Sequence, residues 1–536
     1  MIKHRINPCS VIVAATMTLF ATLAPGAAVQ AQTEAKALLN ARCAACHQAT
    51  DDGGLSRINE VRKTPEAWDM TLVRMMLVHG VQITADERHT LAKYLADSQG
   101  LAPAETQGWR YVLERRGNVM ESPPDADLAV MCARCHSYAR TALQRRDTED
   151  WLKHVHFHLG QWPTIEYQAL GRDRNWWEIA STSVPEKLGE LYPLNTSEWS
   201  EWQERDKVDL SGAWRVVGHQ PGKGSYQGTL TVTGSGDDQY KVSMDINYAS
   251  GDKASGEGNA IVYTGYEWRA QLQLGDQSTL QVFMASESGD ELSGRWFLED
   301  SDSLGGDLTA VRMDTGTARI LAVAPEYVRA GETKEVAVHG VNLDGDVGLG
   351  DGVEVVSTVT RDPQTVVVQV KANADASVGT RTVKVGAATA SELFTVYHQV
   401  DSVRVEPAYA IARVGGADGP LPPVPAQFDA VAYANGPDGE PDTDDDIRIG
   451  VMPATWSVDN FSETAVGMDD VKYAGNMQAG GLFVPAGAGL NLERPFSTNN
   501  VGDLAVKASV ADGTSTVEGS GHLIVTVQRW NDPPIR

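Results

Sequence analysis

Two short motifs of cysteine and histidine are the residues in this sequence whose types and spacing could do chemistry. Each motif reads C-x-x-C-H, the pattern to which c-type haem is attached. Two cysteines three residues apart at a helical turn can form thioethers with both vinyl groups of one porphyrin, and the adjacent histidine then binds the iron as its proximal ligand. The sequence therefore predicts two covalently bound haem c groups. The attachment residues are Cys43 and Cys46 with His47, and Cys132 and Cys135 with His136.

The small number of cysteines supports this interpretation. The chain has 5 cysteines, and Cys9 lies in a stretch that we expect to be removed on export. A single C-x-x-C-H could belong to a redox dithiol or form half of a zinc site, but two copies with no other cysteine in the mature chain favour haem. We therefore expect the mature protein to contain neither a disulfide nor a free thiol.

The first 31 residues have the layout of a secretory signal peptide. Basic residues at the start precede an apolar run from Val11 to Leu23 and small residues up to Ala31. This run is short for a membrane span, and no later stretch is apolar enough. We expect a soluble, periplasmic protein that is not a membrane protein. The formal net charge of -26 argues against a nucleic-acid partner.

Each haem motif is followed by the same helical pattern. Thr64-Pro65 and Asp147-Thr148 are typical helix starts with acidic first turns, and each is followed by a tryptophan. Aligning Trp68 with Trp151 reveals an internal repeat of two cytochrome modules. A further helix, Glu87 to Leu95, is expected to close the first module.

The distal iron ligands are predicted from the same alignment. In the second module no methionine lies between His136 and Met244, so the distal ligand there should be a histidine. The alignment places Met75 opposite His158, and we favour these two residues. The alternatives are Met76 and His79 in the first module and His154 and His156 in the second.

From about residue 209 the sequence changes to short alternating strands separated by Gly, Ser and Asp. With 536 residues the chain is too long for one core. Gly212-Ala213-Trp214 resembles the G-x-W motif of lipocalins, although a packed tryptophan is the simpler interpretation. The pattern from Ile320 to Leu343 resembles immunoglobulin-like modules.

An acidic loop, 438–446, lacks EF-hand spacing, so we interpret it as a solvated loop or a partner contact rather than a calcium site.

The expected fold class is a multidomain α + β protein, with helical cytochrome modules in tandem followed by β-domains. The expected divisions are a signal peptide (1–31), two cytochrome c modules (32–120 and 121–208), a lipocalin-like antiparallel β-barrel (209–317) and two immunoglobulin-like β-sandwiches (318–398 and 399–536).

This order of domains resembles the large (alpha) subunit of quinohaemoprotein amine dehydrogenase. The resemblance rests on the two C-x-x-C-H motifs, on the segment from Trp68 to His79 with its Arg74-Met75-Met76, and on the G-x-W barrel. It implies the diheme electron-transfer subunit of a periplasmic heterotrimer that oxidises primary amines to aldehydes. It further implies a small subunit that carries cysteine tryptophylquinone, a propeller subunit, and a periplasmic copper protein or cytochrome c as electron acceptor.

The cysteine count agrees with a quinone on another subunit, because a chain whose mature cysteines all bind haem has none left for a cysteine-derived quinone. The amine chemistry is therefore expected on a partner, and no catalytic residue is expected here.

One alternative function is a diheme c-type peroxidase, which needs a haem with an open distal site, whereas both modules offer several distal candidates. The other is a cytochrome-tagged binding protein whose β-domains recognise a polymer.

Overall fold

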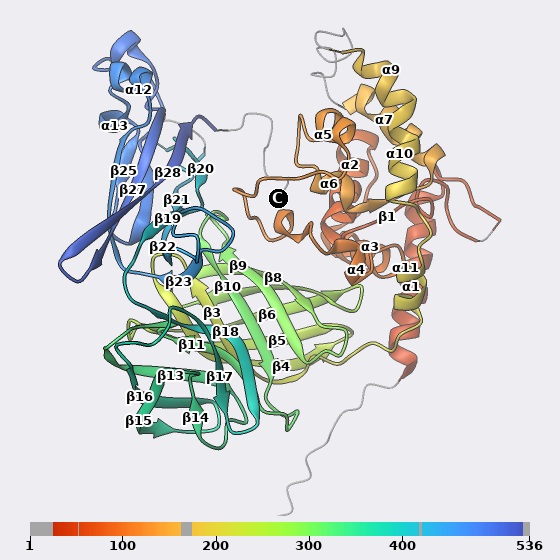
Figure 1. The fold of residues 1–536 in the computed structure, drawn as a ribbon. Coiled ribbons are helices and arrows are strands. Elements are labelled where there is room, and N and C mark those ends of the chain that lie inside the picture. The colour runs from red at the N-terminus through yellow and green to blue at the C-terminus, as the bar shows by residue number, and fades with distance from the viewer. Residues whose placement is uncertain (1–24, 52, 162–173, 417–420, 529–536) are drawn as a thin grey trace, which may run out of the picture.

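A computed structural model describes residues 25–51, 53–161, 174–416 and 421–528 of the chain. Figure 1 shows a helical N-terminal region beside a β-barrel, and two further groups of sheets on the far side of the barrel. The protein is thus a mixed α/β multidomain chain with its helices concentrated in the N-terminal region and a closed eight-stranded barrel, as the sequence predicts at this level.

The helical region consists of two halves that repeat the same arrangement. Each half has a helix that ends in a haem motif, a helix that carries the tryptophan of the repeat (Trp68 or Trp151), and a closing helix. In the first half these are α1 (Pro25–Cys43), α2 (Pro65–His79) and α3 (Ala85–Ser98), and in the second they are α5 (Ala126–Cys132), α7 (Thr148–Gln161) and α10 (Ser183–Leu191). Shorter elements connect them: α4 (Pro103–Thr106), η1 (Arg110–Val112), α6 (Ala139–Ala142), α9 (Trp176–Ser181) and α11 (Ser197–Gln203).

Side chains just before the helices determine where they begin. The Thr64 hydroxyl accepts a hydrogen bond from the Ala67 N–H, with Pro65 as the first helical residue of α2. Asp147 accepts a hydrogen bond from the Asp150 N–H at the start of α7. The predicted starts of both tryptophan helices are therefore confirmed. The closing helix predicted over Glu87 to Leu95 is also confirmed, as the longer α3.

Two short strands join the halves of the helical region. β1 (Arg62–Lys63) pairs antiparallel with β2 (Gln144–Arg145), so that Arg62 lies opposite Arg145. The offset of 83 residues that aligns Trp68 with Trp151 also aligns Arg62 with Arg145. The two halves therefore meet, at this pair, through equivalent residues.

The tryptophans make equivalent contacts in the two halves. Trp68 is 2% exposed and its indole N–H donates to the Gln99 carbonyl oxygen at 2.8 Å. Trp151 is 1% exposed and its indole N–H donates to the Tyr192 carbonyl oxygen at 3.4 Å. Both indoles thus attach the tryptophan helix to the end of the closing helix.

The barrel is one closed sheet in which every strand pairs antiparallel with its neighbours in sequence. Alternation along the strands buries one face, because successive side chains point to opposite sides. Trp214 of the G-x-W motif is fully buried, as expected for a packed tryptophan, and its indole N–H donates to Leu210 O at 3.1 Å. The strands are β3 (Gly212–Gln220), β4 (Gly224–Gly236), β5 (Gln239–Tyr248), β6 (Lys253–Tyr263), β7 (Glu267–Leu274), β8 (Gln277–Ala285), β9 (Glu291–Leu298) and β10 (Gly305–Arg312).

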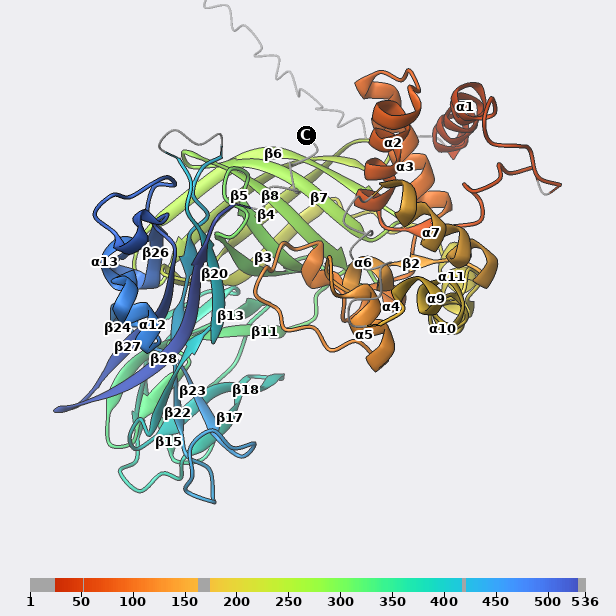
Figure 2. The ribbon, with the colours of Figure 1, turned by 90° about the horizontal axis from the view of Figure 1, so that it is seen from above.

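A buried ionic network joins the helical region to the barrel. Glu267, at the start of β7, is 1% exposed and accepts hydrogen bonds from both terminal nitrogens of Arg110, at 2.5 and 3.1 Å. Arg269 Nη1 lies 2.8 Å from Oε2 of the same carboxylate, and Arg269 Nε donates to Glu66, in the first turn of α2, at 2.5 Å. In Figure 2, seen from above, helices α2 and α3 lie beside strand β7 of the barrel.

The first group of C-terminal sheets consists of two four-stranded sheets that share one hydrophobic core. Val336 and Val338 of one sheet and Phe394 and Val396 of the other are fully buried in it. The first sheet contains β11 (Arg319–Ala324), β13 (Thr333–Val341), β16 (Thr365–Ala372) and β15 (Val353–Arg361), and the second contains β12 (Tyr327–Arg329), β18 (Ala388–Tyr397), β17 (Gly379–Val385) and β14 (Val347–Gly348).

The second group of sheets surrounds another core, in which Phe428 and Phe483 are fully buried. In the acidic loop, Arg404 forms ion pairs with Asp442 and with the buried Asp446. The three sheets contain β19 (Ser402–Glu406), β22 (Asp429–Ala434) and β23 (Ile447–Val451); β20 (Tyr409–Arg413), β28 (Ser515–Thr526), β27 (Gly502–Asp512) and β24 (Ala454–Asn460); and β21 (Ala426–Gln427), β26 (Leu482–Pro485) and β25 (Gly475–Met477). Helices α12 (Glu463–Met468) and α13 (Asp470–Tyr473) lie between strands β24 and β25.

Among the described residues, no helix is both long and apolar enough to cross a membrane. The predicted signal peptide, residues 1–31, lies mostly outside the described ranges, and its last residues belong to α1.

Candidate haem sites

The first C-x-x-C-H motif forms the turn that ends α1. Cys43 is the last residue of the helix, and its carbonyl oxygen accepts hydrogen bonds from the N–H groups of Cys46, at 3.1 Å, and His47, at 3.0 Å. This turn brings both thiols and the imidazole close together. Cys43 is half-buried and Cys46 is exposed, which leaves one thiol toward the module and one toward its surface.

The second motif follows the same plan at the end of α5. Asp125 starts this short helix by accepting a hydrogen bond from Leu128 N–H, and Cys132 is its last residue. Burial raises the pKa of the Cys132 thiol to about 12, whereas Cys135 is exposed. Burial also raises the pKa of Cys43. Among the described residues the cysteines form no disulfide.

Three predicted ligands present an imidazole in the orientation that a metal requires. The Nδ1 atom of His47 donates to the Ser56 carbonyl oxygen at 2.7 Å, that of His136 to Ser137 at 2.8 Å, and that of His158 to His154 at 2.9 Å. A carbonyl only accepts, so Nδ1 carries the proton and Nε2 keeps its lone pair. A backbone carbonyl on the outer nitrogen is the usual support of a metal-binding histidine. These residues therefore fit haem iron.

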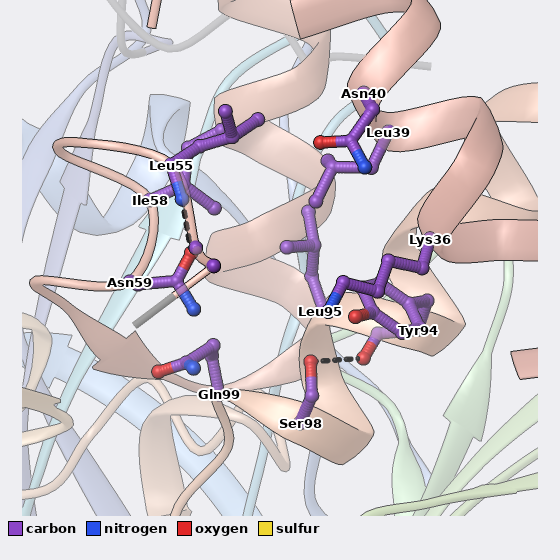
Figure 3. Close-up of a pocket in the computed structure, with 12 residues that line it drawn as sticks. Lys36, Leu39, Asn40, Leu55, Ile58, Asn59, Tyr94, Leu95, Ser98 and Gln99 are labelled. Carbon is purple, nitrogen blue, oxygen red and sulfur yellow. Dashed lines mark hydrogen bonds between the residues drawn. The ribbon is translucent and has the colours of Figure 1, made fainter. Parts of the chain in front are cut away.

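The loop that orients His47 is held by its own side chains. Asn59 accepts a hydrogen bond from the Leu55 N–H at 2.8 Å, next to the residue whose carbonyl oxygen receives His47 Nδ1. Figure 3 shows this loop beside a hollow of about 100 Å³ between α1, α3 and the loop. Its lining includes Leu39, Asn40, Leu55, Ile58, Leu95 and Gln99.

In the first module the distal candidates lie on the last turns of α2. Met75 and Met76 are partly buried, whereas His79, the last residue of the helix, is exposed. Gly80 ends the helix in the left-handed conformation, with φ of 71°, and its N–H donates to the Met75 carbonyl oxygen. The structure thus places both methionines deeper in the module than His79, and Met75 stays a prediction.

In the second module two of the three histidine candidates of α7 share a face, and the third lies on another. The rings of His154 and His158 are 5.2 Å apart, whereas His156 is exposed and its ring lies 5.0 Å from that of Trp177. Burial lowers the pKa of His136, and the nearby charges of Arg140 and His158 lower it further. The structure therefore places His154 and His158 next to each other and directs the ring of His156 toward Trp177.

Sequence reasoning missed the charged residues between the modules. Glu105 is 7% exposed and accepts hydrogen bonds from both terminal nitrogens of Arg62, at 2.8 and 2.9 Å, and from Arg145 Nε at 3.0 Å. Thr196 donates to the same carboxylate at 2.9 Å. The only available signal was that the repeat aligns Arg62 with Arg145; nothing local marks Glu105 as their partner.

Comparison with known families gives one consistent result along the chain. Models of the quinohemoprotein amine dehydrogenase alpha subunit match four consecutive stretches. The haem-binding region of that subunit matches residues 33–199, its domain II residues 207–313, its domain III residues 317–398 and its domain IV residues 403–535. No curated protein matches the chain.

Several solved structures resemble parts of the protein. A redesigned β-barrel, mFAP1, bound to DFHBI is 19% identical, with 19% of this chain and 91% of that chain covered and a TM-score of 0.17. Domains 5-6 of the S-layer protein SbsC are 15% identical over 40% of this chain and 100% of that chain, with a TM-score of 0.15. Drosophila N-cadherin EC1-3 is 9% identical over 46% and 85% of the two chains, with a TM-score of 0.21. At these scores the likenesses carry no argument about function.

Proposed function

The chain belongs to the family of quinohemoprotein amine dehydrogenase alpha subunits, and from this premise we propose that it is the diheme electron-transfer subunit of a periplasmic amine dehydrogenase. The family makes it a haem-binding subunit of an oxidoreductase complex. The finer proposal is that it carries two haem c groups and passes electrons from a quinone on a partner subunit to an external acceptor.

One observation carries this proposal. Each C-x-x-C-H turn holds two thiols beside a histidine whose Nδ1 is bonded to a carbonyl oxygen and whose Nε2 is available to iron. In this arrangement the cysteines anchor the porphyrin and the histidines His47 and His136 bind iron. Haem supplies one-electron chemistry when bound, and the chain's residues fix its position and its surroundings.

The distal ligands that we propose are Met75 and His158. His158 is supported by its Nδ1 bond to the His154 carbonyl oxygen and by the internal alignment with Met75. Met75 is supported by its partial burial and by the internal alignment. In the second module His158 and His136 would give the iron two strongly donating imidazoles. In the first module the thioether of Met75 would favour ferrous iron.

The amine chemistry is proposed to lie on a partner chain. The four cysteines of the described residues are all assigned to haem, so cysteine tryptophylquinone belongs to a small subunit. A propeller subunit would complete the heterotrimer, and a copper protein or cytochrome c would accept the electrons. We interpret the barrel as lipocalin-like and the C-terminal sheet groups as immunoglobulin-like, in the role of a scaffold for these partners.

The proposal predicts that haem stays with the chain under denaturing conditions. Two thioethers per haem survive unfolding, so the mature chain should show haem-dependent peroxidase activity on a denaturing gel and two haems per chain in a pyridine haemochrome assay. Cys135→Ala should leave one thioether in the second module and weaken the haem signal. Complete extraction of haem from the wild-type chain by acidified acetone would contradict covalent attachment.

The same proposal predicts unequal haem potentials. With methionine on one iron and histidine on the other, the His47 haem should have the higher potential, and electrons should collect there. Met75→His should bring the two potentials together and remove a near-infrared band from thioether ligation, both measured by spectroelectrochemistry. Met76→Leu is the matched control and should change neither. A wild-type ferric protein without that band would instead assign His79 as the ligand.

A further inference from the structure

The two tryptophan helices meet through residues that the repeat makes equivalent. The guanidinium of Arg74, on α2, lies 4.7 Å from the ring centroid of Phe157, on α7. The offset of 83 residues that relates the modules also relates these two positions. Phe157 in turn lies beside His158, with ring centroids 6.3 Å apart. Arg74 of the first module therefore lies over the residue next to His158, the proposed iron ligand of the second module.

Besides the partly buried Arg74, two fully enclosed cations lie at the same interface, again at equivalent positions. Lys63 is 6% exposed; its ammonium donates to the Thr71 hydroxyl at 2.6 Å and lies 4.2 Å above the Trp68 ring. Arg146 is 5% exposed and lies 5.6 Å from the ring of Trp151. Each module thus buries one cation against its own tryptophan.

Carboxylates do not balance these charges. Asp150 is fully buried and pairs with Arg146, and it also lies 2.9 Å from Arg57 Nε. In the contacts among described residues, neither Lys63 nor Arg74 has a carboxylate partner. Burial, followed by the charges of Arg146 and Arg74, lowers the pKa of Lys63 well below its usual value, and the charge of Asp150 offsets only part of this effect. Burying cations without a carboxylate partner is costly, so an anion placed beside Lys63 and Arg74 would stabilise this interface.

We propose that Lys63, Arg74 and Arg146 form a cation cluster that binds the propionate carboxylates of the His136 haem. The inference rests on the proposed function and deepens it. Arginine and lysine at an interior site pair strongly with carboxylates. The His136 haem is chosen because Arg74 lies over the ring of Phe157, whose centroid is 6.3 Å from that of His158, the proposed distal ligand of this haem. The cluster would also raise the potential of this haem, since positive charge favours the ferrous state.

The decisive experiment removes one charge and measures potentials in the full-length holoprotein. Arg74→Gln should lower the reduction equilibrium constant of the His136 haem at least tenfold, which is about 59 mV for a one-electron couple. Arg74→Lys, which keeps the charge, should preserve the wild-type value. Lys63→Met should act in the same direction as Arg74→Gln. The control is Arg88→Gln, which removes a cation that pairs with Asp69 at 3.1 Å on the other side of α2.

The outcomes separate this inference from the proposed function. A wild-type chain with fewer than two covalent haems would overturn the function. With two haems present, a shift in Arg74→Gln no larger than that in Arg88→Gln would overturn the cluster, whether or not Lys63→Met folds. An equal shift in Arg74→Lys and Arg74→Gln would also overturn it, because packing rather than charge would then set the potential.

Discussion

Replacing Glu105 with glutamine is expected to destabilise the helical region by about 3–5 kcal/mol, because it leaves two buried guanidinium groups without their carboxylate. Glu105 pairs with both Arg62 and Arg145, which are 2% and 6% exposed. Burial alone would raise the pKa of Glu105, but the hydrogen bond from Arg62 and the charge of Arg145 hold it below its usual value. The ionised carboxylate is therefore the form that the interface requires.

Chemical denaturation followed by circular dichroism measures this effect. The matched control is Glu149→Gln, which removes an exposed carboxylate that pairs with Lys153 on the surface of α7; such pairs contribute about 0–1 kcal/mol. Equal stability of Glu105→Gln and Glu149→Gln would show that Glu105 does not hold the modules together.

Glu267→Gln is expected to loosen the attachment of the helices to the barrel, and the effect should depend on pH. Burial alone would raise the pKa of Glu267, but Arg110 and Arg269 lower it from 4.5 to about 2. A carboxyl group whose pKa is lower in the folded state stabilises that state above the pKa of the unfolded chain. Its contribution, about 3 kcal/mol for a shift of this size, is therefore present above about pH 4.5 and is lost as the pH falls toward 2.

The measurement is the difference in unfolding free energy between wild type and Glu267→Gln from pH 7 to pH 2.5. This difference should be constant down to about pH 5 and should shrink below it, as Glu267 becomes protonated in the unfolded chain while it stays ionised in the folded protein. Glu257→Gln, on the exposed face of β6, serves as control and should stay close to wild type throughout. A difference that does not change with pH would contradict a role for the ionised carboxylate.

Local signals in the sequence were enough to predict the elements that carry the candidate site. Thr64-Pro65 and Asp147 mark the starts of α2 and α7 because capping depends on residues within one turn. The alternation of apolar residues predicted the strands of the barrel for a similar reason. The spacing of the C-x-x-C-H motifs is also local, since one turn of backbone brings both thiols and the imidazole together.

Contacts between distant residues could not be predicted in this way. Glu105 meets arginines 43 and 40 residues away, and Arg110 meets Glu267 at a separation of 157 residues. Nothing in the periodicity of a helix or strand records such partners, because any surface carboxylate has the same local sequence signature. The cation cluster around Lys63 was likewise hidden, since its charges come together only when the two modules pack.

The pairing of Arg62 with Arg145 has a consequence for the history of the chain. Contact through equivalent residues is the geometry of a two-fold symmetric dimer, in which one surface patch meets its own copy. A single-haem ancestor that associated in this way would need no new interface after its gene was duplicated and fused. Later divergence at matched positions, such as Arg74 and Phe157, would then make the two halves of the helical region unequal.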